Sequence, residues 1–224
     1  MTKLSTQTLD ILKNFASINS NLIVKSGEAL STISEAKNIM AIAEISETFE
    51  STFGIYDLNE FISMFSLMND PDLDFTADSV VFKSGRTKAS YRFADQSILT
   101  TPKSKINMPA ADLVVHIGSD LLAQIRKAAG VLGHTIVSIS GDAGEITLSV
   151  VDPKNSTANS FSVILDDAND NKNNFDLQFL IANLKVIPGD YEVKISSKLI
   201  SHWTNTSSPI NYYIALEKTS SYNA

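Results

Sequence analysis

The sequence lacks several features on which whole classes of protein depend. It has no cysteine, so neither disulfides nor thiolate metal sites are possible. Its three histidines, His116, His134 and His202, are scattered without the spacing of metal ligands. No run approaches the roughly 18 consecutive apolar residues that a membrane helix needs, and residues 1–10 do not resemble a secretory signal peptide. A cytoplasmic protein without metal or cofactor is therefore expected.

Sequence motifs of common enzymes are also missing. There is no G-x-S-x-G nucleophile elbow, no G-x-x-x-x-G-K-[ST] phosphate loop and no H-E-x-x-H metal motif. Asp70, Asp72 and Asp74 have the spacing of a carboxylate metal site but lack the glycine and distal glutamate of a calcium loop, so a turn followed by a strand is the simpler interpretation. A solvated loop is predicted at a second acidic group: Asp166, Asp167 and Asp170. We therefore predict no catalytic residues and no enzyme.

The composition is that of a globular protein with an acidic balance. The chain has 224 residues, of which 43% are hydrophobic and 19% charged, so it can bury a substantial core in one large domain or two smaller ones. The net charge of −7 argues against a general nucleic-acid binder, because phosphates attract basic domains. Any hypothesis that involves DNA must explain this acidity.

Apolar residues recur at helical spacing in four segments: residues 4–18, 58–68, 120–132 and 177–187. Asp57, Asp120 and Asp176 stand at the starts of the last three as expected N-terminal caps. Pro188 and Gly189 are expected to end the fourth. The sequence therefore predicts four amphipathic helices.

Short runs between these segments alternate apolar with polar residues, which is typical of antiparallel strands with one covered face. The clearest are residues 40–45, 80–83, 90–93, 135–140, 146–151, 161–165, 191–195 and 212–216. The His202-Trp203 pair is interpreted as packing within a strand, with Trp203 covering a sheet edge or a subunit seam.

The two halves of the chain repeat this order of helix, strands, helix and strands. At the second helix, Tyr56-Asp57-Leu58 matches Phe175-Asp176-Leu177, which lies 119 residues later. At the first, three apolar residues match partners 113 residues later: Leu9 with Leu122, Leu12 with Ile125, and Phe15 with Ala128. The predicted fold is therefore α+β, with two similar domains that each pack two helices on antiparallel β-sheet.

The join between the domains is expected within residues 100–110. This stretch has no periodicity, and Pro102 and Pro109 favour an extended crossing. We place the first domain at residues 1–104 and the second at residues 105–224.

Basic residues are concentrated on the predicted helices. They are Lys13, Arg126, Lys127 and Lys185, with Lys3 just before the first helix. Lys13 and Arg126 are equivalent at the 113-residue offset. Apart from the cap aspartates, only Asp10 and Glu60 are acidic there, so these polar faces are mildly positive while the rest of the chain is acidic. A randomly mixed solvated face is the alternative explanation.

Four stretches resemble the trimeric sliding clamps of tailed phages. They are residues 12–20 (Leu-Lys-Asn-Phe-Ala-Ser-Ile-Asn-Ser) followed by Lys25-Ser-Gly27; Ile55-Tyr-Asp-Leu-Asn59; Ile181-Ala-Asn-Leu-Lys185 with Pro188-Gly-Asp-Tyr191; and Asn211-Tyr-Tyr-Ile-Ala-Leu-Glu217. The resemblance runs from end to end of the chain, although residues 72–105 match poorly.

The resemblance implies the DNA clamp fold, in which three subunits close head to tail, sheets form the outer wall and helices line the hole. A ring holds duplex DNA topologically, so a few cations give enough attraction to phosphates without reading bases, and an acidic outer wall repels DNA. The predicted DNA-binding residues are Lys3, Lys13, Arg126, Lys127 and Lys185. Because Arg126 and Lys127 are about 100° apart on a helix, only one of them is expected to face DNA.

The resemblance also implies partners, namely a DNA polymerase, an ATP-driven clamp loader and, in some phages, late-transcription proteins. A pocket beside the interdomain crossing would receive a hydrophobic tail, and its expected lining is Met108, Leu113, Tyr213 and Leu216. Two alternatives belong to other classes. One is a β-rich structural or assembly protein of a virion with no role on DNA, and the other, more distant, is an enzyme that uses the Asp70, Asp72 and Asp74 carboxylates.

Overall fold

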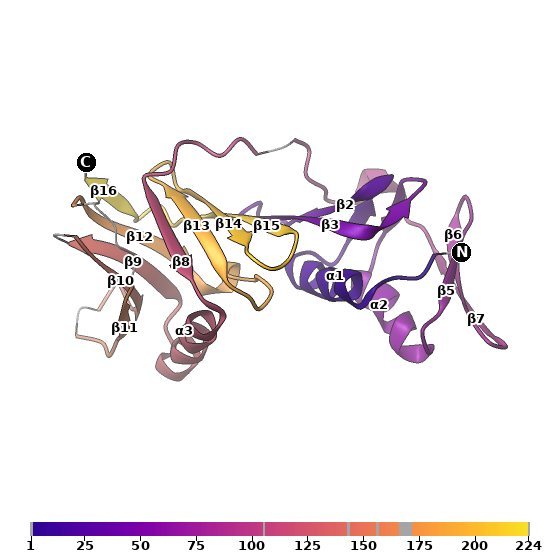
Figure 1. Cartoon of the computed structure of the whole chain (residues 1–224), viewed down its shortest axis with the longest axis horizontal. Coiled ribbons are helices and arrows are strands. Elements are labelled where there is room, and N and C mark those ends of the chain that lie inside the picture. Colours follow the sequence, from indigo (N-terminus) through magenta and orange to yellow (C-terminus); the bar gives the residue numbers. More distant parts are fainter. Residues whose placement is uncertain (1, 105, 143, 156, 166–171, 224) are drawn as a thin grey trace. The chain divides into compact units, whose positions relative to one another are not determined.

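The chain forms two compact units in the computed structural model, Met1–Lys105 and Ile106–Ala224. The boundary falls within residues 100–110. The structure describes residues 2–104, 106–142, 144–155, 157–165 and 172–223 (Figure 1). The predicted acidic loop at Asp166, Asp167 and Asp170 lies outside these described residues.

Two helices organise unit 1, α1 (Thr6–Ile18) and α2 (Leu58–Leu67). Ile11 and Phe15 of α1 are fully buried. Figure 1 shows this helix lying against the hairpin of β2 (Gly27–Ile33) and β3 (Ile39–Phe49), with α2 at its side. Asp57 caps α2 as predicted, because its side chain accepts hydrogen bonds from the backbone N–H groups of Asn59 (2.9 Å) and Glu60 (3.1 Å).

The strands of unit 1 are all antiparallel. They are β1 (Leu22–Val24), β2 (Gly27–Ile33), β3 (Ile39–Phe49), β4 (Phe53–Ile55), β5 (Asp72–Phe75), β6 (Ser79–Ser84) and β7 (Thr87–Arg92). β1 pairs with β4, β2 with β3, and β5, β6 and β7 form a meander. The strands predicted at residues 40–45 and 80–83 lie within β3 and β6, and the one predicted at residues 90–93 overlaps the end of β7. The turn and strand predicted at Asp70–Asp74 are confirmed by β5, whose first residue is Asp72.

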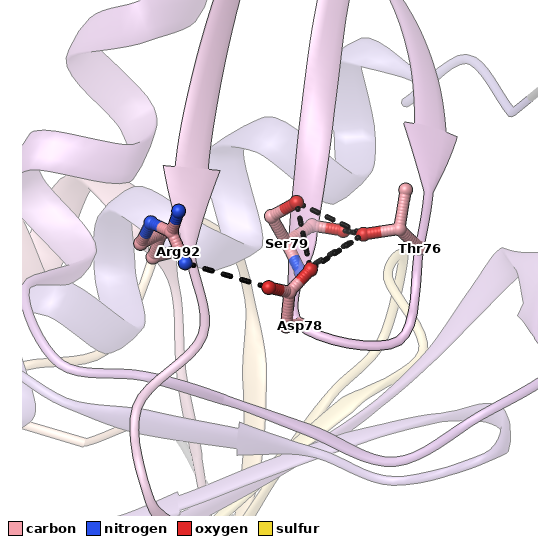
Figure 2. A network of polar contacts seen from close by, with 4 residues as sticks. All are labelled: Thr76, Asp78, Ser79 and Arg92. Carbon is pink, nitrogen blue, oxygen red and sulfur yellow. Dashed lines mark hydrogen bonds and ion pairs between the residues drawn. The ribbon is translucent and has the colours of Figure 1, made fainter.

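The β5–β6 turn is closed by a local polar network (Figure 2). The Thr76 hydroxyl accepts a hydrogen bond from the Ser79 N–H (3.1 Å) and donates one to the Ser79 carbonyl (2.9 Å). Arg92 at the end of β7 adds an exposed ion pair to Asp78 at 3.4 Å, which contributes little stability in water. The charge of Arg92 is therefore engaged with this turn.

Unit 2 contains α3 (Ser119–Leu132), a short 3₁₀ turn η2 (Ile181–Asn183) and nine strands among its described residues. β11 (Phe161–Ile164), β10 (Glu145–Val151), β9 (Ile136–Asp142), β12 (Asn174–Leu180) and β16 (Ser221–Asn223) are neighbours in that order. β15 (Ile210–Ala215), β14 (Ile200–Asn205), β13 (Tyr191–Ser196) and β8 (Leu113–Ile117) are neighbours in a second group. The strands predicted in this half are confirmed, and α3 packs on β10.

Trp203 lies in the interior of unit 2. It is 1% exposed on β14, its Nε1–H donates to the Ser201 hydroxyl at 2.9 Å, and its ring contacts Phe179 and Tyr191 edge-on with centroids 6.0 and 5.9 Å away. The prediction that it packs within a strand is confirmed. The expectation that it covers a sheet edge or a subunit seam is wrong.

The fourth predicted helix is also wrong, because residues 174–180 form β12 and only the η2 turn follows. Phe175, Leu177 and Phe179 are all buried, which is the two-residue period of a strand. Asp176 caps no helix; it accepts hydrogen bonds from the side chains of Ser138 and Gln178. The α+β class with two similar domains stands, but α3 is the single α-helix in the described part of unit 2.

None of the helices in the described residues combines the length and the apolar character needed to cross a membrane.

Glu47 ties strand β3 to the start of α1. The buried carboxylate accepts hydrogen bonds from the Ser5 N–H and from the Thr8 hydroxyl, the latter at 2.5 Å. Burial by itself would raise the pKa of Glu47, but the hydrogen bonds from Thr8 and Ser5 outweigh it and lower the pKa. The carboxylate therefore stabilises the fold in its ionised form.

We expect Glu47→Gln to lower the free energy of unfolding by about 1–2 kcal/mol at pH 7, because two acceptor contacts are lost or mispaired. The lowered pKa means that this stabilisation is complete above the ordinary value of 4.5 and is lost as the pH falls through the folded-state value. Urea titrations at pH 7 and pH 3 should show the difference from the parent shrinking with acid. Glu44→Gln, at an exposed position of the same strand, is the control. An equal difference at both pH values would contradict the role of the charge.

Candidate nucleic-acid interface

The two predicted DNA-binding lysines of unit 1 are exposed and each has an acidic neighbour. Lys3 precedes α1, and its ammonium pairs with the Asp70 carboxylate; the hydrogen bond to Asp70 raises the pKa of Lys3. Lys13 on α1 pairs with Asp10 at 3.0 Å, one helical turn earlier. Such exposed pairs exchange readily with solvent and with other charges, so both cations remain accessible to a phosphate.

Arg126 and Lys127 differ sharply although they are adjacent on α3. Lys127 is exposed. Arg126 is half-buried, and its Nη2 donates hydrogen bonds to the backbone carbonyls of Leu184 (2.7 Å) and Val186 (2.8 Å). Burial lowers the pKa of Arg126 from the ordinary guanidinium value, but a guanidinium stays charged at any physiological pH. Lys127 is therefore the member of the pair that faces solvent.

The pattern of burial on the two helices corrects the predicted equivalence of Lys13 and Arg126. Ile11 of α1 corresponds to Ile125 of α3, and both are buried, as are the next pair one turn on, Phe15 and Ala129. These pairs are 114 residues apart, not 113. One residue turns a helix face by about 100°, so Lys13 corresponds to Lys127. Arg126 takes the place of the buried Leu12.

Lys185 lies outside the helices, in residues 184–190, which follow η2 without regular secondary structure. Leu184 and Val186 are buried, whereas Lys185 between them is exposed. Because Arg126 binds the carbonyls of both flanking residues, Lys185 is held against α3. The structure thus brings Lys185 to the helix that carries Lys127.

Asp190 caps α3, a role that the sequence assigned to Asp120. The N-cap residue is Gly118, which has no side chain to accept a hydrogen bond, and the Asp190 carboxylate accepts one from the Ser119 N–H at 2.8 Å. Asp120 lies in the first turn of the helix. No local pattern reveals this cap, because Asp190 and Ser119 are 71 residues apart.

The four residues predicted to line a partner pocket all belong to unit 2, but they differ in accessibility. Leu113 and Leu216 are buried side chains of its core. Tyr213 is half-buried on β15 and stacks on His202 with ring centroids 4.6 Å apart, and Met108 is half-buried in the stretch before β8. Only Met108 and Tyr213 therefore present appreciable side-chain surface to a partner.

Two of the three aspartates considered as a metal or catalytic site, Asp70 and Asp74, form ion pairs with lysines. Asp70 pairs with Lys3, and Asp74 pairs with Lys83 at 2.5 Å. The hydrogen bond from Lys83 lowers the pKa of Asp74. Among the residues that the structure describes, no group of three or more potential ligands is arranged to hold a metal ion.

Strand β11 forms an edge of its sheet and lies beside α3. Between them lies a cavity of about 320 Å³ with an apolar lining that includes Ala128, Val131 and Phe161. A second cavity, of about 470 Å³, includes Leu121 and Ile164. Val131 is 78% exposed and Ile164 57% exposed, which is unusual for such large apolar side chains. No pattern in the sequence predicted this surface.

Comparison with known proteins matches each unit to a clamp family. Residues 3–100 match the family described as DNA polymerase processivity factor, and residues 114–218 match the C-terminal family of the gp45 sliding clamp. The sliding clamp of Vibrio phage KVP40 is 30% identical over 221 residues, which cover 96% of this chain and 99% of the relative. Those of Escherichia phage RB69 and Enterobacteria phage T4 are also 30% identical, and each alignment covers 99% of both chains. The chain belongs to the sliding-clamp family.

Solved structures show that the clamp fold persists at much lower identity. The beta sliding clamp of Caulobacter crescentus is 14% identical with a TM-score of 0.69, over 98% of this chain and 66% of that one. Proliferating Cellular Nuclear Antigen of Entamoeba histolytica is 14% identical with a TM-score of 0.64, over 94% and 95% of the two chains. The predicted resemblance to phage clamps is thus confirmed, and these similarities give no support to a virion assembly protein.

We expect removal of the α3 cap in this clamp to cost stability. Asp190→Ala should lower the free energy of unfolding by about 1 kcal/mol, because the Ser119 N–H loses its acceptor. Asp120→Ala removes an equal charge from the same helix end and should cost only a few tenths of a kcal/mol through the helix dipole. Urea unfolding of the two variants in parallel measures both effects. A larger loss for Asp120→Ala would show that Asp120 is the cap after all.

Proposed function

We propose that this clamp encircles duplex DNA as a homotrimeric ring and tethers the replicative polymerase without sequence-specific contacts. The main support for this proposal is the 30% identity to phage sliding clamps over nearly the whole length of each chain. Tethering by a ring needs no chemical step, so the protein requires no cofactor and no catalytic residues. Its place of action is the cytoplasm, and that of the host cell if the chain is phage-encoded.

The attraction to DNA is assigned to exposed lysines on equivalent helix positions. Lys13 on α1 and Lys127 on α3 supply one cation in each unit, and Lys185 adds a second in unit 2. Contacts of this kind attract phosphates without reading bases and weaken as salt rises. Lys3, which precedes α1 and lies outside the equivalent helix positions, is a weaker contributor. Arg126 is not assigned a direct contact, because its guanidinium binds backbone carbonyls.

The proposed partners besides DNA are the polymerase, an ATP-dependent clamp loader and, in some phages, late-transcription proteins. These assignments rest on membership of the clamp family. Of the predicted pocket residues, Met108 and Tyr213 are proposed as partner contacts, because they expose side-chain surface whereas Leu113 and Leu216 serve the core.

Reversing the helix charges tests the DNA assignment. We expect the double variant Lys13→Glu and Lys127→Glu to shorten the lifetime of loaded clamps on nicked circular DNA several-fold at low salt, with less effect at high salt because screening weakens the lost contacts. Lifetimes are measured by the decay of labelled protein from isolated DNA circles.

The matched control is the pair Lys25→Glu and Lys218→Glu, which makes the same change in charge at exposed positions outside the helices. Equal lifetimes for the two double variants would remove the special role of the helix lysines. Thermal unfolding of each variant verifies that the fold is intact.

The exposed edge of unit 2 supports assembly with further copies of the chain. An unpaired strand edge bordered by apolar side chains is prone to association with another chain, and β11 with Val131 and Ile164 combines both features. A head-to-tail ring uses two different surfaces of each subunit, and the β11 edge is assigned to one of them.

Light scattering after size-exclusion chromatography should give a mass of about three times the 24.4 kDa of one chain. We expect Ile164→Lys to shift the protein towards monomer at micromolar concentration, because a lysine on a strand edge opposes edge pairing. Leu67→Lys, at another exposed apolar position, is the control and should remain trimeric. A monomeric parent would contradict the ring, and a trimeric Ile164→Lys would move the contact away from β11.

A further inference from the structure

Residues 184–190 are fastened to the rest of unit 2 along their length. At the first end, Nη2 of Arg126 donates to the carbonyls of Leu184 and Val186 at 2.7 and 2.8 Å. At the last end, the Asp190 carboxylate accepts from the Ser119 N–H at the start of α3. The contacts at Arg126 and Ser119 are two helical turns apart, so the segment runs along α3 in the opposite direction.

The middle of this segment is held by two tyrosines. The Tyr191 hydroxyl donates to the Ile187 carbonyl at 2.7 Å, and the Ile187 N–H donates to the Tyr212 hydroxyl at 3.1 Å. Burial raises the pKa of Tyr191 to about 12 and also raises that of Tyr212, so both hydroxyls keep their protons near neutral pH. Hydrogen bonds therefore fix the backbone on both sides of Lys185.

Unit 1 shows what this segment replaces. There α1 packs against α2, and Leu12 of α1 is buried. In unit 2 no second α-helix occurs among the described residues, and the position of Leu12 is occupied by Arg126. An extended segment leaves carbonyl groups without helical partners, and a guanidinium is suited to bind two of them at once.

We propose that Arg126 is a positioning residue, which holds residues 184–190 against α3 and thereby presents Lys185 beside Lys127. The clamp's cationic surface in unit 2 is then the pair of lysines, while Arg126 acts through the backbone that it binds. The role of the two lysines on DNA rests on the proposed function, whereas the role of Arg126 in holding residues 184–190 is independent of it.

The alternative is that Arg126 attracts phosphates by its charge alone. Substitution by lysine separates the two roles, because lysine keeps the charge but its compact ammonium does not reproduce the planar fork that binds both carbonyls. Arg126→Lys and Arg126→Gln should therefore behave alike if the residue positions the segment. They should differ if the charge matters by itself.

The first measurement is hydrogen exchange of the trimer without DNA. Both Arg126 variants should exchange the Leu184 and Ile187 amides about ten-fold faster or more, because loss of the two guanidinium bonds favours local opening. These amides are informative, since in the parent they donate to the Ile181 carbonyl and the Tyr212 hydroxyl. Lys127→Gln should leave them unchanged. Amides of β14 report whether the unit as a whole is destabilised.

The second measurement is the lifetime on nicked circular DNA. Arg126→Lys should shorten it as Lys185→Gln does, to within about two-fold. Unchanged exchange at Leu184 and Ile187 in both Arg126 variants would overturn the inference. The inference would also be overturned if Arg126→Lys kept the parental lifetime on DNA while Arg126→Gln had a shortened one.

A different outcome would separate this inference from the proposed function. If exchange accelerates in the Arg126 variants while Lys127→Gln and Lys185→Gln both keep the parental lifetime, Arg126 holds the segment as inferred. The assignment of these lysines to DNA is then wrong.

Discussion

Each unit depends on one amphipathic helix whose buried stripe fixes the direction of its charged face. In α1 the stripe contains Ile11 and Phe15, and in α3 it contains Ile125 and Ala129. Successive helical residues are about 100° apart, so a residue two positions after a buried one points to roughly the opposite side. Lys13 follows Ile11 by two residues and Lys127 follows Ile125 by two, so core packing alone places both lysines outward. The packing of the two cores is therefore enough to expose these lysines, and no separate binding loop is needed.

The two units reach this arrangement by different means, because unit 1 has a second α-helix and the described part of unit 2 does not. In unit 1 a second helix covers the flank of α1. In unit 2 an extended segment covers α3, and side chains of Arg126, Tyr191 and Tyr212 bind its backbone polar groups. A helix satisfies its own backbone internally, whereas an extended segment needs side chains from elsewhere. The polar residues that accumulate around residues 184–190 meet this requirement.

The same difference decides how much the sequence alone could predict. Helical period sufficed for α1, helical period with the local cap Asp57 sufficed for α2, and alternation sufficed for the strands named from it, because these signals lie within a few residues of one another. At residues 174–187 the two periods overlap: Leu177, Leu180 and Leu184 fit a helix, while Phe175, Leu177 and Phe179 fit a strand. The strand forms there because β12 pairs with β9 and β16, which lie elsewhere in the sequence. The roles of Arg126 and Asp190 were equally out of reach, because their partners are 58 to 71 residues away.

The acidity of the chain is consistent with a clamp, because a closed ring can retain DNA without a high binding affinity for it. A protein that binds DNA by contact alone needs affinity from many cations, and a net charge of −7 would oppose it. A closed ring retains DNA without that affinity, and strong contacts would slow its movement along the duplex. Few lysines on an otherwise acidic chain are then an advantage, provided that their positions are fixed. On this view the half-buried guanidinium of Arg126 serves DNA better through the backbone it holds than through its own charge.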